Sequence, residues 1–149
     1  MFLLDTNVVS ELRKKARGQA DGNVVAWEES WPASLMHLSV VSLAEILTGV
    51  ALKTRTDPQA GRVLAAWADR LPVVFGHRLL SIDVEVAKAC APLHVPDPVG
   101  DGDAWIAATA AVHGLTVVTR NTRHFDRLGV DVVNPWDPLD DPRRTAPLG

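Results

Sequence analysis

The chain opens on MFLLDTNVVSEL, residues 1–12, an apolar run that ends on a carboxylate. Residues 2–4 predict a short buried strand, and residues 7–13 predict a helix, because their apolar side chains recur on one helical face. Asp5 lies at the junction of these two elements. Two interpretations stay open here, because an aspartate in this place can cap the helix N-terminus or bind a ligand at the carboxyl end of the strand.

Strand and helix signals alternate along the rest of the chain. Short apolar or alternating stretches predict further strands over residues 35–42, 79–82, 115–119 and 130–135. Apolar side chains at helical spacing predict helices over residues 23–31, 46–53, 57–71, 83–90 and 103–113, the second and third of these forming a hairpin. This order is typical of an α/β sandwich with a mostly parallel sheet, in which ligands bind beyond the carboxyl ends of the strands.

Length and composition predict one globular domain. The 149 residues are 47% hydrophobic and 22% charged, as in folded proteins that bury a core of their own. We expect this domain over residues 1–136 and a flexible tail over residues 137–149, which is polar and rich in proline. No apolar run approaches the roughly 20 residues that span a bilayer, and the first residues lack signal-peptide features. We therefore expect a cytoplasmic protein that does not enter membranes.

Cysteine and glycine usage excludes other classes of site. Cys90 is the only cysteine, which excludes an intramolecular disulfide and argues against a structural zinc site. The common glycine-rich phosphate loops are also missing from the sequence. The formal net charge of -3 leaves nucleic acid open as a partner, because an acidic protein binds it wherever basic residues cluster.

Three carboxylates are candidates for a shared site: Asp5, Glu45 and Asp103. Each is predicted in the first turn of a helix, and such helix starts can converge on one edge of the sheet. Structural roles are open for each of them. Ser42 and Glu45 have the spacing of a capping box, the helix dipole favours Asp103 in a first turn, and Asp101 could cap the same helix.

If the three carboxylates converge, their mutual repulsion must be relieved. Their pKa values would rise, or a cation would neutralise them. Mg²⁺ or Mn²⁺ suits a set of oxygen ligands, whereas zinc would require histidine or cysteine. Such an ion activates a bound water and stabilises charge on a phosphate, as metal-dependent nucleases require.

Basic residues in two segments are candidates for binding a polyanion beside these acids. They are Arg13, Lys14, Lys15 and Arg17 in the first segment, and Arg120, Arg123, His124 and Arg127 in the second. Ordinary solvated surface charge is the alternative explanation for either segment. The helix that begins at Asp103 is apolar almost all round, so it must be covered on several sides, and a second subunit is one way to cover it.

Several motifs together resemble one protein family. They are MFLLDTNVVSEL, SLAE at residues 42–45, DAWIAATA at 103–110, VVTRNTRHF at 117–125 and GVDVVNPW at 129–136. In this order they resemble PIN-domain ribonucleases, specifically the VapC/FitB-like toxins of type II toxin-antitoxin pairs. The resemblance extends over roughly residues 1 to 136.

The resemblance implies a fold, an activity and a set of partners. The fold is a three-layer α/β/α sandwich, and the activity is a Mg²⁺- or Mn²⁺-dependent endoribonuclease. The partners are an RNA substrate, a small cognate antitoxin and further copies of the chain in a homodimer or larger assembly. By position, the catalytic and metal-binding acids are Asp5, Glu45 and Asp103, and the residues that support them are Thr6, Asn7, Thr119 and Asn121.

This sequence departs from the family pattern at the fourth acid. Relatives usually place it where Asn121 stands, or where His124 stands a few residues later. Asp126 is acidic but lies one or two positions away from the place of the family's acid. Asn121 can still bind an ion through its side-chain carbonyl, so both residues are candidates for the fourth ligand. We expect weaker binding of any second metal ion, with three carboxylates sufficient for one.

Two other functions compete with the nuclease. A phosphatase could use Asp5 as a nucleophile, although haloacid-dehalogenase-like enzymes usually need an aspartate at the place of Asn7. A catalytically weakened module could act mainly by binding its antitoxin and a promoter. The intact acids argue against this second alternative, and the missing fourth acid favours it.

Overall fold

A computed structural model describes residues 1–138 and 140–141. Within this part of the chain, five strands form one parallel sheet in the order β3-β2-β1-β4-β5. Their bounds are β1 (Phe2–Leu4), β2 (Met36–Ser39), β3 (Leu79–Leu80), β4 (Thr116–Val118) and β5 (Val132–Val133). The predicted parallel sheet is thereby confirmed, with the opening stretch of the sequence as its central strand.

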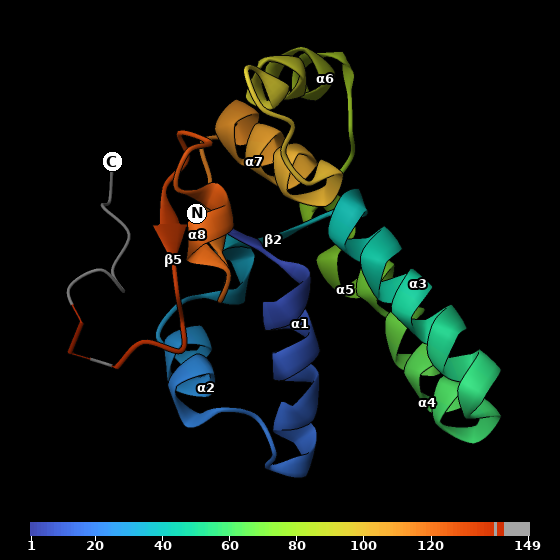
Figure 1. Ribbon diagram of the computed structural model, residues 1–149. Helices are drawn as coiled ribbons and strands as arrows, with labels where there is room; N and C mark the ends of the chain where they lie inside the picture. Colours follow the sequence, from blue (N-terminus) through green and yellow to red (C-terminus); the bar gives the residue numbers. More distant parts are fainter. Residues whose placement is uncertain (139, 142–149) are drawn as a thin grey trace.

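Alternation along β1 separates two cores on opposite faces of the sheet. Phe2 and Leu4 pack with α1 (Thr6–Leu12), α2 (Gly22–Glu29) and the helices that follow, whereas Leu3 packs with α7 and α8. On this second face α7 (Asp101–His113) lies against the sheet, α8 (Thr122–Phe125) lies beside it, and α6 (Val84–Cys90) covers α7 from outside. Figure 1 shows the layers, which confirm the predicted α/β/α sandwich.

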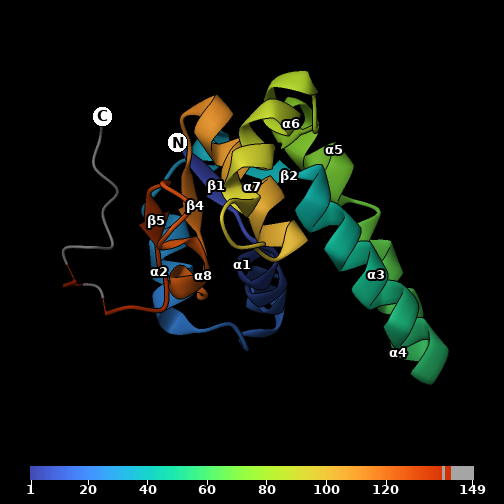
Figure 2. The ribbon, with the colours of Figure 1, turned by 45° about the horizontal axis from the view of Figure 1, so that its top comes forward.

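The predicted helical hairpin consists of α3 (Val40–Thr56) and α4 (Pro58–Ala68), which run together away from the sheet in both views (Figures 1 and 2). Asp57 begins α4 by accepting a hydrogen bond from the Ala60 amide at 3.0 Å. The two helices touch where Gly61 faces Thr54, because a Cβ at Gly61 would lie 2.5 Å from the Thr54 Cα. The helix predicted over residues 57–71 ends earlier, and a separate short helix, α5 (Leu71–Phe75), follows.

The second strand is shorter than predicted. Residues 35–42 were expected to form it, but β2 ends at Ser39 and α3 begins at Val40. The Ser39 hydroxyl accepts a hydrogen bond from the Val41 amide at 3.1 Å and caps α3. This local cap overrides the strand preference of the two valines.

The apolar helix α7 is covered by its own chain. Its side chains pack against the sheet on one side and against α6 on the other. Burial between these two layers explains its composition without a second subunit. Gly114 ends the helix in the left-handed conformation with φ of 61°, as predicted.

Short elements complete the described chain. Residues 121–129 contain the unpredicted helix α8, fixed by the buried side chains of Phe125 and Leu128. Four 3₁₀ segments connect other elements: η1 (Arg13–Arg17), η2 (Ala33–Leu35), η3 (Gly76–Arg78) and η4 (Ala91–His94). None of the helices in the described residues is long and apolar enough to cross a membrane. Most of the tail predicted to be flexible lies outside the described residues.

Candidate active site

Asp5 lies directly beyond the central strand and is 5% exposed. Its backbone amide continues the sheet by donating to the Val118 carbonyl at 3.0 Å. One carboxylate oxygen, Oδ1, accepts from the Thr6 amide at 2.7 Å and caps α1. Capping therefore accounts for one oxygen of Asp5 and leaves the environment of the other to be explained.

The second oxygen of Asp5 is held by two side chains. Oδ2 accepts from the Thr119 hydroxyl at 2.6 Å and from the Asn7 side-chain amide at 2.7 Å. Thr119 follows β4, and the pairing of Leu4 with Val118 places it next to Asp5 at the same edge of the sheet. Asn7 and Thr119 therefore both contact Asp5 directly.

Glu45 joins two distant parts of the chain. Its carboxylate accepts a hydrogen bond from the Thr6 hydroxyl on α1. It also lies against the start of α7, because a Cβ at Gly102 would come within 2.5 Å of Glu45 Oε1. Thr6 therefore contacts two of the three acids, Asp5 through its amide and Glu45 through its hydroxyl.

The capping-box interpretation of Glu45 is wrong. Ser39 is the N-cap of α3, so Glu45 stands in the second helical turn and not in the first. The Ser42 hydroxyl is buried and makes no hydrogen bond to the part of the chain that the structure describes. With no helix start to cap, the Glu45 side chain extends to the acid site.

Asp103 stands in the first turn of α7, directly after the glycine that Glu45 lies against. Its side chain is 28% exposed, and its Oδ2 lies 3.0 Å from Nδ1 of His124. His124 extends from α8, at one of the two positions where the family pattern places an acid. A histidine contact thus stands where a fourth carboxylate was expected.

The three carboxylates influence one another electrostatically. The pKa of Asp5 is raised above its ordinary value of 3.8, chiefly because burial disfavours the charged form. The charges of Glu45 and Asp103 raise this pKa further, while hydrogen bonds from Thr119 and Thr6 oppose the rise. The site therefore concentrates negative charge that these hydrogen bonds only partly offset.

The ligand chemistry fits a hard divalent cation. Asp5, Glu45 and Asp103 offer only oxygen atoms, and a cation would stabilise the ionised form of Asp5 against burial, the main cause of its raised pKa, and against repulsion from the other two acids. Among the described residues, no three acidic, histidine or cysteine side chains are already grouped to ligate one ion. Glu45 instead contacts the Thr6 hydroxyl, and Asp103 contacts His124.

The two candidates for a fourth ligand, Asn121 and Asp126, lie in different surroundings, and the Asn121 backbone carbonyl accepts a hydrogen bond from the His124 amide at 3.0 Å. Asn121 is exposed, and its backbone amide donates to the Thr119 hydroxyl at 3.0 Å. Asp126 lines a different cavity, together with Thr122 and Asn134. Asn121 thus touches the network around Asp5, whereas Asp126 is not among the described residues that line the cavity containing Asp103.

The basic residues predicted to bind RNA divide into groups. Lys14 pairs with Glu11 at 2.7 Å, and Lys15 pairs with Glu28 at 2.6 Å. The Arg120 guanidinium stacks 4.1 Å from the centre of the Trp136 ring. The glutamates offset the charge that the two lysines can offer to a polyanion, and the Trp136 ring covers one face of the Arg120 guanidinium.

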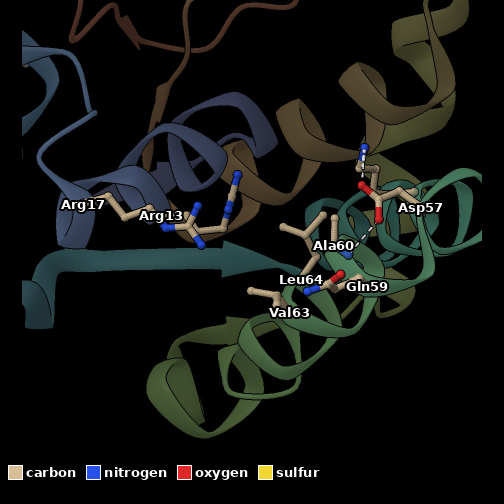
Figure 3. A pocket seen from close by; sticks show the side chains of 8 residues that line it. Arg13, Arg17, Asp57, Gln59, Ala60, Val63 and Leu64 are labelled. Atoms are coloured by element: carbon tan, nitrogen blue, oxygen red, sulfur yellow. Dashed lines mark hydrogen bonds and ion pairs between the residues drawn. The ribbon is translucent and has the colours of Figure 1, made fainter.

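Two arginines of the first segment line a cavity of about 450 Å³. Figure 3 shows Arg13 and Arg17 across from Gln59, Val63 and Leu64 of α4. Arg123, in contrast, lines a second cavity that contains Asp103. Both segments therefore reach an acid of the site: Arg123 lies beside Asp103, and Arg13 also lines a further cavity together with Glu45.

Gly102 is the site residue that the sequence reasoning missed. Its lack of a side chain leaves space for the Glu45 carboxylate at the start of α7. The available signal was the glycine immediately before Asp103, which was interpreted only as part of a loop.

Comparisons with known proteins agree with this geometry. Residues 2–131 match the PIN domain. The chain is 36% identical to VapC ribonuclease Y4jK of Sinorhizobium fredii, covering 93% of this chain and 99% of that relative. It is 38% identical to toxin FitB of Neisseria gonorrhoeae, covering 91% and 99%. A solved structure of FitAB bound to an IR36 DNA fragment matches with a TM-score of 0.81 and 35% identity, covering 93% of this chain and 97% of that one.

The match in sequence extends over nearly the whole chain and coincides with the match in fold. The strands and helices that carry Asp5, Glu45 and Asp103 all lie within the matched residues. The chain therefore belongs to the PIN-domain family and is a VapC/FitB-like member of it.

Proposed function

We propose that this protein is a divalent-metal-dependent endoribonuclease that acts as the toxin of a toxin-antitoxin pair. The observation that carries the proposal is the buried Asp5 carboxylate, whose pKa is raised in part by Glu45 and Asp103. A ribonuclease and a toxin among the similar proteins support the same conclusion.

Each acid has a distinct role in this proposal. Asp5, Glu45 and Asp103 would hold Mg²⁺ or Mn²⁺, and Asn7 and Thr119 fix the orientation of Asp5. A bound ion supplies an activated water and stabilises the charge that develops on the scissile phosphate. His124 positions the Asp103 carboxylate through their contact at 3.0 Å.

The proposal includes a cognate antitoxin that blocks this site. Support comes from the similar FitAB complex, which was solved bound to DNA. We further propose that the toxin acts in the cytoplasm, where RNA is available, and that it forms a homodimer or larger assembly. Coexpression with the adjacent small gene should relieve the growth arrest that expression of this chain alone produces.

The direct test is cleavage of single-stranded RNA by the purified chain. Cleavage should require added Mg²⁺ or Mn²⁺ and should stop with chelator. Asp5→Asn and Asp103→Asn should each reduce it by more than the roughly 10- to 100-fold typical of residues outside the metal's direct ligands. Cleavage at the wild-type rate by both variants, once contaminating nucleases are excluded, would refute the assignment.

A catalytically weakened binding module is the second candidate. Two observations favour it: His124 replaces an expected acid, and the described residues contain no preassembled group of three metal ligands. This candidate predicts tight antitoxin binding with no RNA cleavage under either metal. The nuclease proposal predicts cleavage in the same preparation.

A further inference from the structure

A cavity of about 400 Å³ opens beside Asp103. Its walls combine one acid of the proposed catalytic site with three basic side chains on and after α8. The lining residues are Val99, Gly100, Asp103, Arg123, His124 and Arg127. An anion in this cavity would therefore lie next to the metal site without occupying it.

The fold holds the segment that carries these basic side chains in place. Phe125 and Leu128 are 0% and 5% exposed and pack in the core against α7. Arg123 and Arg127 are four residues apart, so they lie on the same side of this short segment. Because the apolar side chains anchor the segment to the core, the backbone of both arginines is held beside the cavity that their side chains line.

The two arginines are available to a ligand. Arg123 and Arg127 are exposed, and neither has an ion pair or hydrogen bond with any residue that the structure describes. Lys14 and Lys15, in contrast, are paired with glutamates, and Arg120 stacks on Trp136.

The geometry points to a phosphate-binding subsite for single-stranded RNA, formed by Arg123 and Arg127 beside Asp103. A guanidinium group binds phosphate through two parallel hydrogen bonds, so two of them suit one phosphodiester well. An acidic site repels the RNA backbone, and cations next to Asp103 offset this repulsion. The inference rests on the proposed function, because it assigns the phosphate to the RNA that the acids would cleave.

The test measures how RNA binding depends on salt. The affinity of the full-length wild-type protein for a single-stranded RNA is measured in the presence of a chelator over a range of salt concentrations. Gels verify that the RNA stays intact. Each phosphate contact on a single strand contributes about 0.7 to the slope of log affinity against log salt. Because the two arginines share one phosphate in this proposal, the double variant Arg123→Gln/Arg127→Gln should lower the magnitude of the slope by about 0.7. With metal present, its KM should rise while kcat is retained.

A matched control is Arg55→Gln/Arg62→Gln, which removes the same charge from exposed positions of the α3–α4 hairpin. Its slope should equal that of the wild type. Equal slopes in both double variants would overturn the subsite and leave the proposed function standing if RNA is still bound and cleaved. Failure of the wild type to bind or cleave RNA at all would overturn both.

Discussion

Asp5 and Asp103 carry the same charge in the same site but are held in different ways. Asp5 is buried, and three donors from Thr6, Asn7 and Thr119 fix both of its oxygens. Asp103 is partly exposed at a helix start, and His124 is the partner that its carboxylate contacts in the described structure. One side of the site is built into the sheet, and the other depends on a helix end and a neighbouring exposed side chain.

This difference indicates which side of the site can exchange its contacts when a ligand binds. The Asp5 side is fixed before any ligand arrives, because one of its donors directly follows β4 and the other two stand in the first turn of α1. Glu45 and Asp103 are held by contacts that a cation can replace. We expect substitutions on the Asp5 side to reduce both stability and activity, and substitutions on the Asp103 side to change activity with little effect on stability.

The largest combined effect is expected for Thr119→Val, which removes a fully buried hydroxyl. Asp5 would lose one donor, and Asn7 and the Asn121 amide would lose an acceptor. The free energy of unfolding should fall by about 1–3 kcal/mol, and kcat should fall roughly 10- to 100-fold. Urea unfolding and RNA cleavage measure the two effects.

The matched control is Thr109→Val. Thr109 is also fully buried, but its hydroxyl donates to the Trp105 carbonyl within α7. This variant should lose stability and keep its cleavage rate per folded molecule. If both threonine variants lost activity equally, the specific role of Thr119 at Asp5 would be contradicted.

The next largest effect is expected for Gly102→Ala, on activity alone. The added methyl group would lie 2.5 Å from Glu45 Oε1, so the flexible carboxylate must move away. Cleavage should fall by roughly tenfold, while the midpoint of unfolding changes little. Gly22→Ala is the control, because a Cβ at that position meets nothing within 4 Å. Unchanged cleavage by Gly102→Ala would show that the position of Glu45 is unimportant.

Gly61→Ala should produce the opposite pattern to Gly102→Ala. Here the added Cβ would lie 2.5 Å from the Thr54 Cα. Backbone atoms cannot move out of the way by a rotamer change, as the Glu45 carboxylate can. The hairpin should lose about 1–3 kcal/mol of stability with normal cleavage per folded molecule. Thermal unfolding and single-turnover cleavage check this contrast, which a wild-type unfolding midpoint would contradict.

The smallest effect concerns pH and the ionisation of Asp5. Its raised pKa means that the folded protein binds this proton more tightly than the unfolded chain does. The stability due to protonated Asp5 is present below 3.8 and is lost as pH rises through the raised pKa. In chelator, the free energy of unfolding of the wild type minus that of Asp5→Asn should therefore fall as pH rises.

Urea unfolding of both proteins between about pH 3.5 and about pH 8 measures this difference. Saturating Mg²⁺ should raise the free energy of unfolding of the wild type at the upper end of this pH range, because a bound cation favours the ionised carboxylate. A difference that grows with pH in chelator would contradict the assigned direction of the Asp5 pKa.

Much of the fold could be predicted from the sequence because its signals are local. The apolar residues 2–4 predicted a buried strand, which lies at the centre of the sheet, and Gly114 predicted the end of α7. The strand over residues 35–42 was too long, because an apolar stretch cannot reveal which of two serines caps the next helix. The helix α8 was missed because its stability comes from burial of Phe125 in the tertiary structure.

The candidate site was likewise predicted in part from the sequence. Asn7 and Thr119 were expected near Asp5 from the family resemblance, and their hydrogen bonds agree with that expectation. The contact of Glu45 with Gly102 joins positions 57 residues apart, and no local pattern encodes it. The same holds for the bond between His124 and Asp103, which depends on how α8 packs against α7.

The most direct test of the central claim is a crystal structure with Mn²⁺, using anomalous scattering to locate the ion. We predict an anomalous peak for a manganese ion ligated by oxygen atoms of Asp5, Glu45 and Asp103, with the Glu45 carboxylate moved away from Thr6. A well-occupied manganese ion elsewhere, with no peak among these three carboxylates at a concentration that supports RNA cleavage, would contradict the claim.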